Sequence, residues 1–158
     1  MVPDRGYALI MVLFFLVLLC LVTVSLSENV FLARKHSFLT FMEIKGTNAA
    51  DSGIAYALEA VRQSSATTSP WWATVTAANA VWIPLETEAG LSVCFEAFPL
   101  GAPTANQLSV QSYGEVVRGP CGNYTANPEE ILSARTVQSV FDLTPGQEKL
   151  VSWQEVLP

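Results

Sequence analysis

The hydrophobic and polar positions divide the chain into an apolar stretch, an amphipathic stretch and a region of short alternating runs. Residues 7–26 (YALIMVLFFLVLLCLVTVSL) carry no charge and contain neither Pro nor Gly. At about 1.5 Å per residue, a helix of this length covers about 30 Å, the thickness of a bilayer's hydrocarbon core. The pattern predicts a membrane-spanning helix over residues 7–26.

A cleavable signal peptide is the alternative interpretation of this stretch. Signal peptides have an apolar region of about 7 to 15 residues and end in a small-x-small cleavage site. Here the apolar stretch is longer, and the positions near Thr23 and Ser25 match such a site poorly. We therefore expect a retained helix preceded by a six-residue leader, residues 1–6.

Residues 27–63 continue with helical spacing. They contain no Pro, and apolar or small residues recur every four positions with others beside them. This stripe consists of Phe38, Met42, Gly46, Ala50, Ile54 and Leu58, with Phe41, Ala57 and Val61. The opposite face is polar and carries Glu43, Lys45, Asp51, Glu59 and Arg62. The pattern predicts one helix over residues 7–63 whose second half packs on a folded domain.

Residues 64–158 have the composition of a small β-rich head. Residues 64–70 are rich in Ser and Thr and end at Pro70, which predicts a helix stop and a loop. Alternating runs bounded by turn residues predict half-buried antiparallel strands over 90–98, 108–113, 135–143 and 149–156. Their inward side chains are Leu91, Val93, Phe95, Val137, Phe141, Leu143, Val151 and Trp153. The predicted fold class is α+β, with a long N-terminal helix on a small antiparallel sheet.

Composition and motifs narrow the possible functions. The net charge is −6, which argues against a nucleic-acid partner because such surfaces normally carry a basic stripe. The one basic run, residues 34–36 (RKH), fits a position near lipid headgroups or a neighbouring helix. His36 is the only histidine, and there is neither a Gly-rich phosphate loop nor a paired-Cys zinc spacing. Four scattered carboxylates are interpreted as solvated surface: Glu86, Glu88, Glu96 and Glu115. We expect no catalysis, no metal site and no cofactor.

Several segments resemble one family. Arg5-Gly6 followed by residues 7–10 (YALI) resembles the class III leader junction of type IV pilins and type II secretion pseudopilins. Residues 48–55 (NAADSGIA) resemble the signature that ends the N-terminal helix of PilX-type minor pilins. The segments 108–114, 134–138 and 151–155 are similar to strands of that family, the last one containing Trp153. The resemblance covers nearly the whole chain and is strongest over residues 5–63.

The resemblance implies a type IV pilin-like fold and a processing step. A prepilin peptidase would cleave between Gly6 and Tyr7 and methylate the new N-terminus at Tyr7. Gly6 suits that role because it has no Cβ, and Arg5 helps to keep the leader in the cytoplasm. The implied parts are a leader at 1–6, the helix at 7–63 with its membrane span at 7–26, and a periplasmic head at 64–158.

Met11 departs from the family pattern, which usually has Glu at this position. In the family that carboxylate is thought to neutralise the N-terminal ammonium of a neighbouring subunit inside the apolar filament core, where an unpaired charge would be costly. The departure suggests a minor pilin that primes assembly of a type IV pilus and lies near its tip. The implied partners are other minor pilins, the major pilin, the prepilin peptidase and the inner-membrane assembly platform. The subunit would move from the inner membrane, with its head in the periplasm, to the extracellular filament.

Two other functions stay open. One is a minor pseudopilin of a type II secretion system, which has the same architecture and different partners. The other is a single-pass membrane-anchored protein that binds a ligand or adheres to a surface without forming a filament.

The cysteines and tryptophans complete the expectations. Cys94 and Cys121 fall in the head, where the implied periplasmic location favours a disulfide; two free thiols or a metal pair are the alternatives. Cys20 is expected to be a small hydrophobic residue of the span. The tryptophans Trp71, Trp72, Trp82 and Trp153 are expected to pack on the core, in preference to forming an exposed adhesive patch. The sequon at 123–125 (NYT) is attributed to chance.

Overall fold

The computed structural model describes residues 5–64, 69–122, 130–144 and 146–156 of the chain. Its elements are α1 (Arg5–Ser64), α2 (Trp71–Thr74), β1 (Ile83–Glu88), β2 (Leu91–Pro99), β3 (Gln107–Arg118), β4 (Ile131–Asp142) and β5 (Lys149–Val156). The long helix predicted over residues 7–63 is confirmed to within two residues at either end. The chain divides into two compact units, residues 1–40 and 41–158, which we call the stem unit and the head unit.

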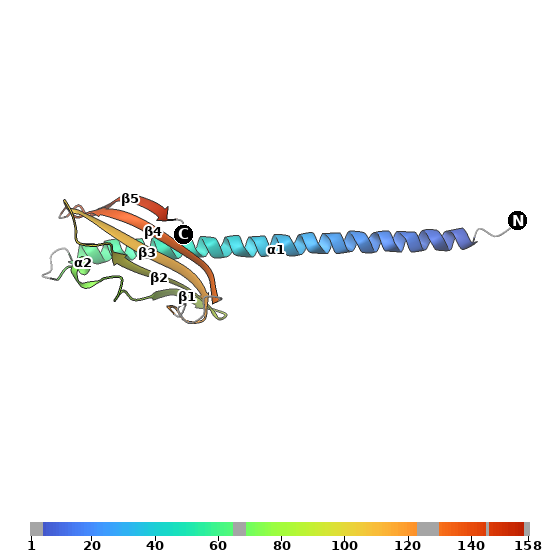
Figure 1. The fold of residues 1–158 in the computed structure, drawn as a ribbon, viewed down its shortest axis with the longest axis horizontal. Coiled ribbons are helices and arrows are strands. Elements are labelled where there is room, and N and C mark those ends of the chain that lie inside the picture. The colour runs from blue at the N-terminus through green and yellow to red at the C-terminus, as the bar shows by residue number, and fades with distance from the viewer. Residues whose placement is uncertain (1–4, 65–68, 123–129, 145, 157–158) are drawn as a thin grey trace. The chain divides into compact units, whose positions relative to one another are not determined.

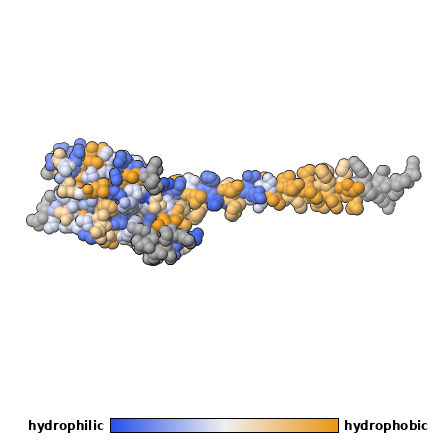
Figure 2. Space-filling view, viewed as in Figure 1, coloured by the Kyte–Doolittle hydropathy of each residue, from blue (hydrophilic) through white to orange (hydrophobic). Residues whose placement is uncertain are grey.

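The stem unit is the first part of α1. Every described side chain from Leu9 to Thr40 is exposed, and the apolar ones include Phe31 at 68% of its full accessible area. Figure 2 shows hydrophobic residues covering the first part of this helix. By length and composition the helix could cross a membrane, and none of its most apolar stretch is buried. A helix that is apolar all round needs lipid or other helices around it.

In the head unit the five strands form one antiparallel sheet in the order β1-β2-β3-β4-β5, so each strand pairs with its sequence neighbours (Figure 1). A two-residue turn joins β1 to β2, and both of its residues, Ala89 and Gly90, have positive φ. Tight hairpins favour this turn because its twist matches that of the strands. The α+β fold class is therefore confirmed as a long helix with an antiparallel sheet.

Residues 41–64 of α1 cover one face of this sheet. Most of the predicted stripe is buried there, and two core clusters form between the helix and β2, β3 and β4. Their helical members are Met42, Ala49, Ala50, Ile54, Ala57 and Val61, and the strands contribute Val93, Ala97, Leu108, Val110, Val116, Val137 and Phe141. Two members of the predicted stripe, Phe38 and Phe41, are exposed. Phe38 belongs to the stem unit, and burial on the sheet begins at Met42.

The strands differ from the prediction at both edges of the sheet. β1 was not predicted; it contains Pro84, a residue that is rare inside strands, and its register shifts between Pro84 and Glu86. Pro is tolerated in a sheet at such an edge or bulge. β5 has the predicted bounds, but it is exposed along nearly its whole length, whereas we expected Val151 and Trp153 to be buried. The helix covers the central strands and leaves this edge open.

Candidate functional site

The apolar surface of the stem unit is the main candidate for a functional site. Between Leu9 and Leu26 no side chain is titratable except the exposed thiol of Cys20. The segment is rich in Leu and Phe, and its large apolar residues keep 42–70% of their accessible area. Such a surface can bind lipid tails or other apolar helices through van der Waals packing.

The residues of the predicted processing site lie at the beginning of α1. Arg5, Gly6 and Tyr7 are in its first turns, and the leader residues before Arg5 lie outside the described part of the chain. Met11 is 43% exposed and lies one helical turn after Tyr7, so the two positions share a face of the helix. In the family that the sequence resembles, a carboxylate usually occupies this position; in this chain it is occupied by the thioether side chain of Met11.

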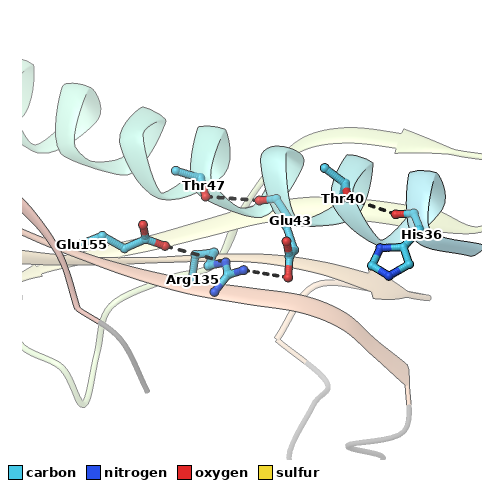
Figure 3. Close-up of polar contacts among 6 residues, drawn as sticks. All are labelled: His36, Thr40, Glu43, Thr47, Arg135 and Glu155. Atoms are coloured by element: carbon cyan, nitrogen blue, oxygen red, sulfur yellow. Dashed lines mark hydrogen bonds and ion pairs between the residues drawn. The ribbon is translucent and has the colours of Figure 1, made fainter.

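Charged residues of α1 form ion pairs with β4 and with the edge strand β1 in the head unit. Nη2 of Arg135 lies 3.0 Å from Oε1 of Glu43, and its Nε lies 3.7 Å from Oε1 of Glu155 (Figure 3). Nζ of Lys45 lies 2.7 Å from Oε2 of Glu86 on β1. Partly exposed pairs of this kind stabilise a fold by about 0–1 kcal/mol each. These contacts therefore help to define the helix position more than they add stability.

A further polar contact ties β5 to the helix. The indole Nε1 of Trp153 donates to Oδ1 of Asp51 at 2.8 Å, although the tryptophan is 46% exposed. Trp71, in contrast, is buried in the core and Trp72 packs against it. The expectation of core packing is confirmed for these two tryptophans and wrong for Trp153. The sequon at 123–125 lies outside the described residues.

At two glycines, Gly114 of β3 and Gly53 of α1, the helix and the sheet approach too closely for a side chain. A Cβ on Gly114 of β3 would collide with the backbone carbonyl oxygen of Gly46 and the backbone nitrogen of Ala50. A Cβ on Gly53 would collide with Oγ of Ser112 and lie 2.9 Å from the Phe95 ring. The predicted stripe includes Gly46, but it gave no sign that Gly114 on the facing strand is needed as well.

The disulfide between Cys94 and Cys121 is confirmed, with Cα atoms 6.0 Å apart. It joins the buried Cys94 of β2 to the segment that follows β3. Closing a loop across a sequence separation of 27 residues stabilises a fold by about 3–4 kcal/mol in the chain-entropy model. The bridge therefore holds this segment on the sheet face opposite α1.

Two of the four glutamates interpreted as solvated are buried, which corrects the prediction. Glu96 is 7% exposed and Glu115 is 3% exposed, whereas Glu86 and Glu88 are exposed. The buried pair lies on adjacent strands, because Glu115 faces Cys94 and Glu96 faces Tyr113 in the register of β2 and β3. The predicted disulfide was the one available sign of the burial of Glu115, because it brings the segment containing Gly122 to this carboxylate.

Burial raises the pKa of both of these carboxyl groups. The nearby charge of Glu115 raises the pKa of Glu96 further. For Glu115 the backbone N–H of Gly122, which donates to Oε1 at 3.2 Å, lowers the pKa and offsets part of the effect of burial. Burial disfavours the charged form of a carboxyl group, so this pair is protonated more readily than free glutamate. Among the described residues, no three His, Cys, Asp or Glu side chains come close enough to hold a metal ion.

No protein-family model matches the chain, and comparisons with curated proteins and with solved structures gave no significant match.

Proposed function

We propose that the chain is a minor pilin of the PilX type, which primes assembly of a type IV pilus and lies near its tip. The observation that carries this proposal is the uncharged and exposed surface of residues 9–26, followed in the same helix by a stripe that packs on an antiparallel sheet. A surface of this kind is stable in a bilayer and among like helices. Moving between the two exchanges one apolar environment for another at modest net cost.

Met11 supports a place at the tip within this proposal. A subunit without a carboxylate one turn after Tyr7 cannot neutralise the terminal ammonium of a neighbour. An unpaired charge in an apolar bundle is very costly. Such a subunit is therefore best placed at the tip, where it does not have to neutralise the N-terminal ammonium of another subunit. The head unit would contact other minor pilins through its exposed surfaces, and no chemistry at the head is required.

Processing at the Gly6–Tyr7 bond gives a direct test. Replacing Gly6 with Val adds a β-branched side chain at the scissile bond. We expect the precursor to keep residues 1–6 and to be missing from sheared filaments. The matched control is Val2→Leu, which changes the leader away from the junction and should leave processing intact. Normal filament incorporation of the Gly6→Val protein would contradict the proposal.

The same stem and head could serve a type II secretion pseudopilin. Co-purification distinguishes the two functions, because pilus subunits in one case and secretion-system subunits in the other should accompany the full chain. A native protein that retains residues 1–6 and is found in neither assembly would favour a membrane-anchored binding protein.

A further inference from the structure

Three consecutive basic residues, Arg34, Lys35 and His36, lie on the stem unit. We call them the basic collar. All three side chains are exposed, and successive residues of a helix point about 100° apart around its axis. The collar therefore presents nitrogen donors in three directions within less than one helical turn.

The collar has no acidic neighbour on its own helix. Positions three and four residues from its members carry no Asp or Glu, and the nearest acidic residues are Glu28 and Glu43. None of the ion pairs of the described residues includes Arg34 or Lys35. The head unit is different, because Lys45 and Arg135 are paired there with glutamates. The charge of the collar is thus open to a partner outside the chain.

The distance from the apolar span suggests what that partner is. Arg34 lies eight residues after Leu26, which is about 12 Å along a helix. The headgroup layer beyond the hydrocarbon core is about 5–7 Å thick. Long basic side chains can extend back over several ångströms to place their charges among headgroups. The apolar residues Val30, Phe31 and Leu32 lie between the span and the collar and are all exposed.

We propose that the basic collar binds the phosphate groups of acidic phospholipids in the leaflet at the C-terminal end of the apolar span. The proposal rests on the membrane insertion assumed in the proposed function, and it requires no filament. Lipid phosphates surround a membrane helix on all sides, so they can satisfy donors that point in three directions. The collar would thereby set how deeply the stem sits in the membrane.

The acidic head unit of a second copy is the competing partner. Residues 41–158 contain 12 acidic and 5 basic side chains, a net charge of −7 from 5 minus 12. Such a head would approach a stem from one side, however, and would leave part of the collar unpaired. Headgroups are favoured for this geometric reason.

The experiment uses the full chain in nanodiscs that contain phosphatidylglycerol and phosphatidylcholine. Native mass spectrometry of the protein released with its bound lipids measures the preference for phosphatidylglycerol. Each basic residue near an acidic membrane surface strengthens binding by about fivefold. In the double variant Arg34→Gln/Lys35→Gln we therefore expect the preference to fall by roughly 10-fold or more. The control Arg118→Gln/Lys149→Gln removes the same charge from exposed positions of the head unit and should keep it.

An unchanged lipid preference in the collar variant, or an equal loss in the control, would overturn the proposal. The proposal would also be overturned if the collar variant lost self-association in pure phosphatidylcholine nanodiscs and kept its lipid preference. That result would mean that the collar binds a second copy of the chain. A chain that enters nanodiscs normally but shows no lipid preference rejects the collar alone. A chain that fails to enter nanodiscs of either lipid also rejects the insertion on which the proposed function depends.

Discussion

Replacing Gly114 with Ala tests the contact that positions the helix on the sheet. The added Cβ would meet the backbone carbonyl oxygen of Gly46 and the backbone nitrogen of Ala50, which cannot rotate away as a side chain can. The φ of Gly114 lies outside the left-handed region, so Ala fits the local backbone and the effect is one of contact alone. Overpacking of a core usually costs about 1–3 kcal/mol. We expect a loss near the upper end, because α1 itself must move and both core clusters must move with it.

A stabilising effect of Ala on the unfolded chain offsets part of this loss. Ala restricts the unfolded chain more than Gly, which stabilises the fold by about 0.4–1 kcal/mol. The expected net loss in the free energy of unfolding is therefore about 2 kcal/mol. Urea unfolding of the full chain in detergent, followed by tryptophan fluorescence, measures it.

Gly46→Ala is the matched control, since it adds the same methyl group at the same interface. Its nearest neighbour is Oγ of Ser133 at 2.8 Å, the end of a small side chain that can rotate. Ala also favours a helix over Gly by about 1 kcal/mol, so this variant should stay within about 1 kcal/mol of the wild type. If Gly114→Ala were as stable as Gly46→Ala, the close approach of helix and sheet would be refuted.

Three further predictions concern the head unit. Because burial raises the pKa of Glu96 and Glu115, the folded state binds protons more tightly than the unfolded state, and stability should fall as the pH rises from about 4.5 through the raised pKa values. Glu96→Gln should reduce the fall in the free energy of unfolding between pH 5 and pH 7, measured by urea unfolding, and should raise stability at pH 7. An unchanged fall would show that the Glu96 carboxyl group is solvated. Cys121→Ser removes the disulfide and should lower the free energy of unfolding by about 3–4 kcal/mol, and reduction of the wild-type protein should lower it by a similar amount. Equal stability of the variant and the oxidised wild-type protein would count against a structural role. Trp153→Phe removes the hydrogen bond to Asp51 and should cost about 0.5–1 kcal/mol by the same assay, and this cost should vanish in an Asp51→Ala background.

The helical half of the fold could be predicted because its signals are local. An uncharged stretch without Pro or Gly and a stripe at four-residue spacing are properties of neighbouring residues along one helix. They placed α1 to within two residues at either end and identified Met42, Ala50 and Ile54 as core residues. The same signals identify the exposed apolar surface of the stem unit.

The sheet was harder to predict because its environment is set by distant segments. Alternation along residues 91–98 correctly gave the face that meets the helix, but it says nothing of what covers the other face. On that face the disulfide holds Cys121 against Cys94 of β2, and the neighbouring Gly122 donates a hydrogen bond to the buried Glu115 of β3. β5 shows the opposite case, since an alternating strand at the edge of a sheet can stay exposed.

The candidate processing site follows from the resemblance at residues 5–10 and remains a prediction. No contact within the described residues depends on a cut after Gly6, so folding alone gives no signal of it.

The most direct test of the proposed function is mass spectrometry of the N-terminal peptide from filaments sheared from native cells. The proposed function predicts a chain that begins at a methylated Tyr7 and is present in the filament fraction at low abundance. A chain that keeps residues 1–6, begins near Ser27 or occurs only in the membrane fraction would contradict it.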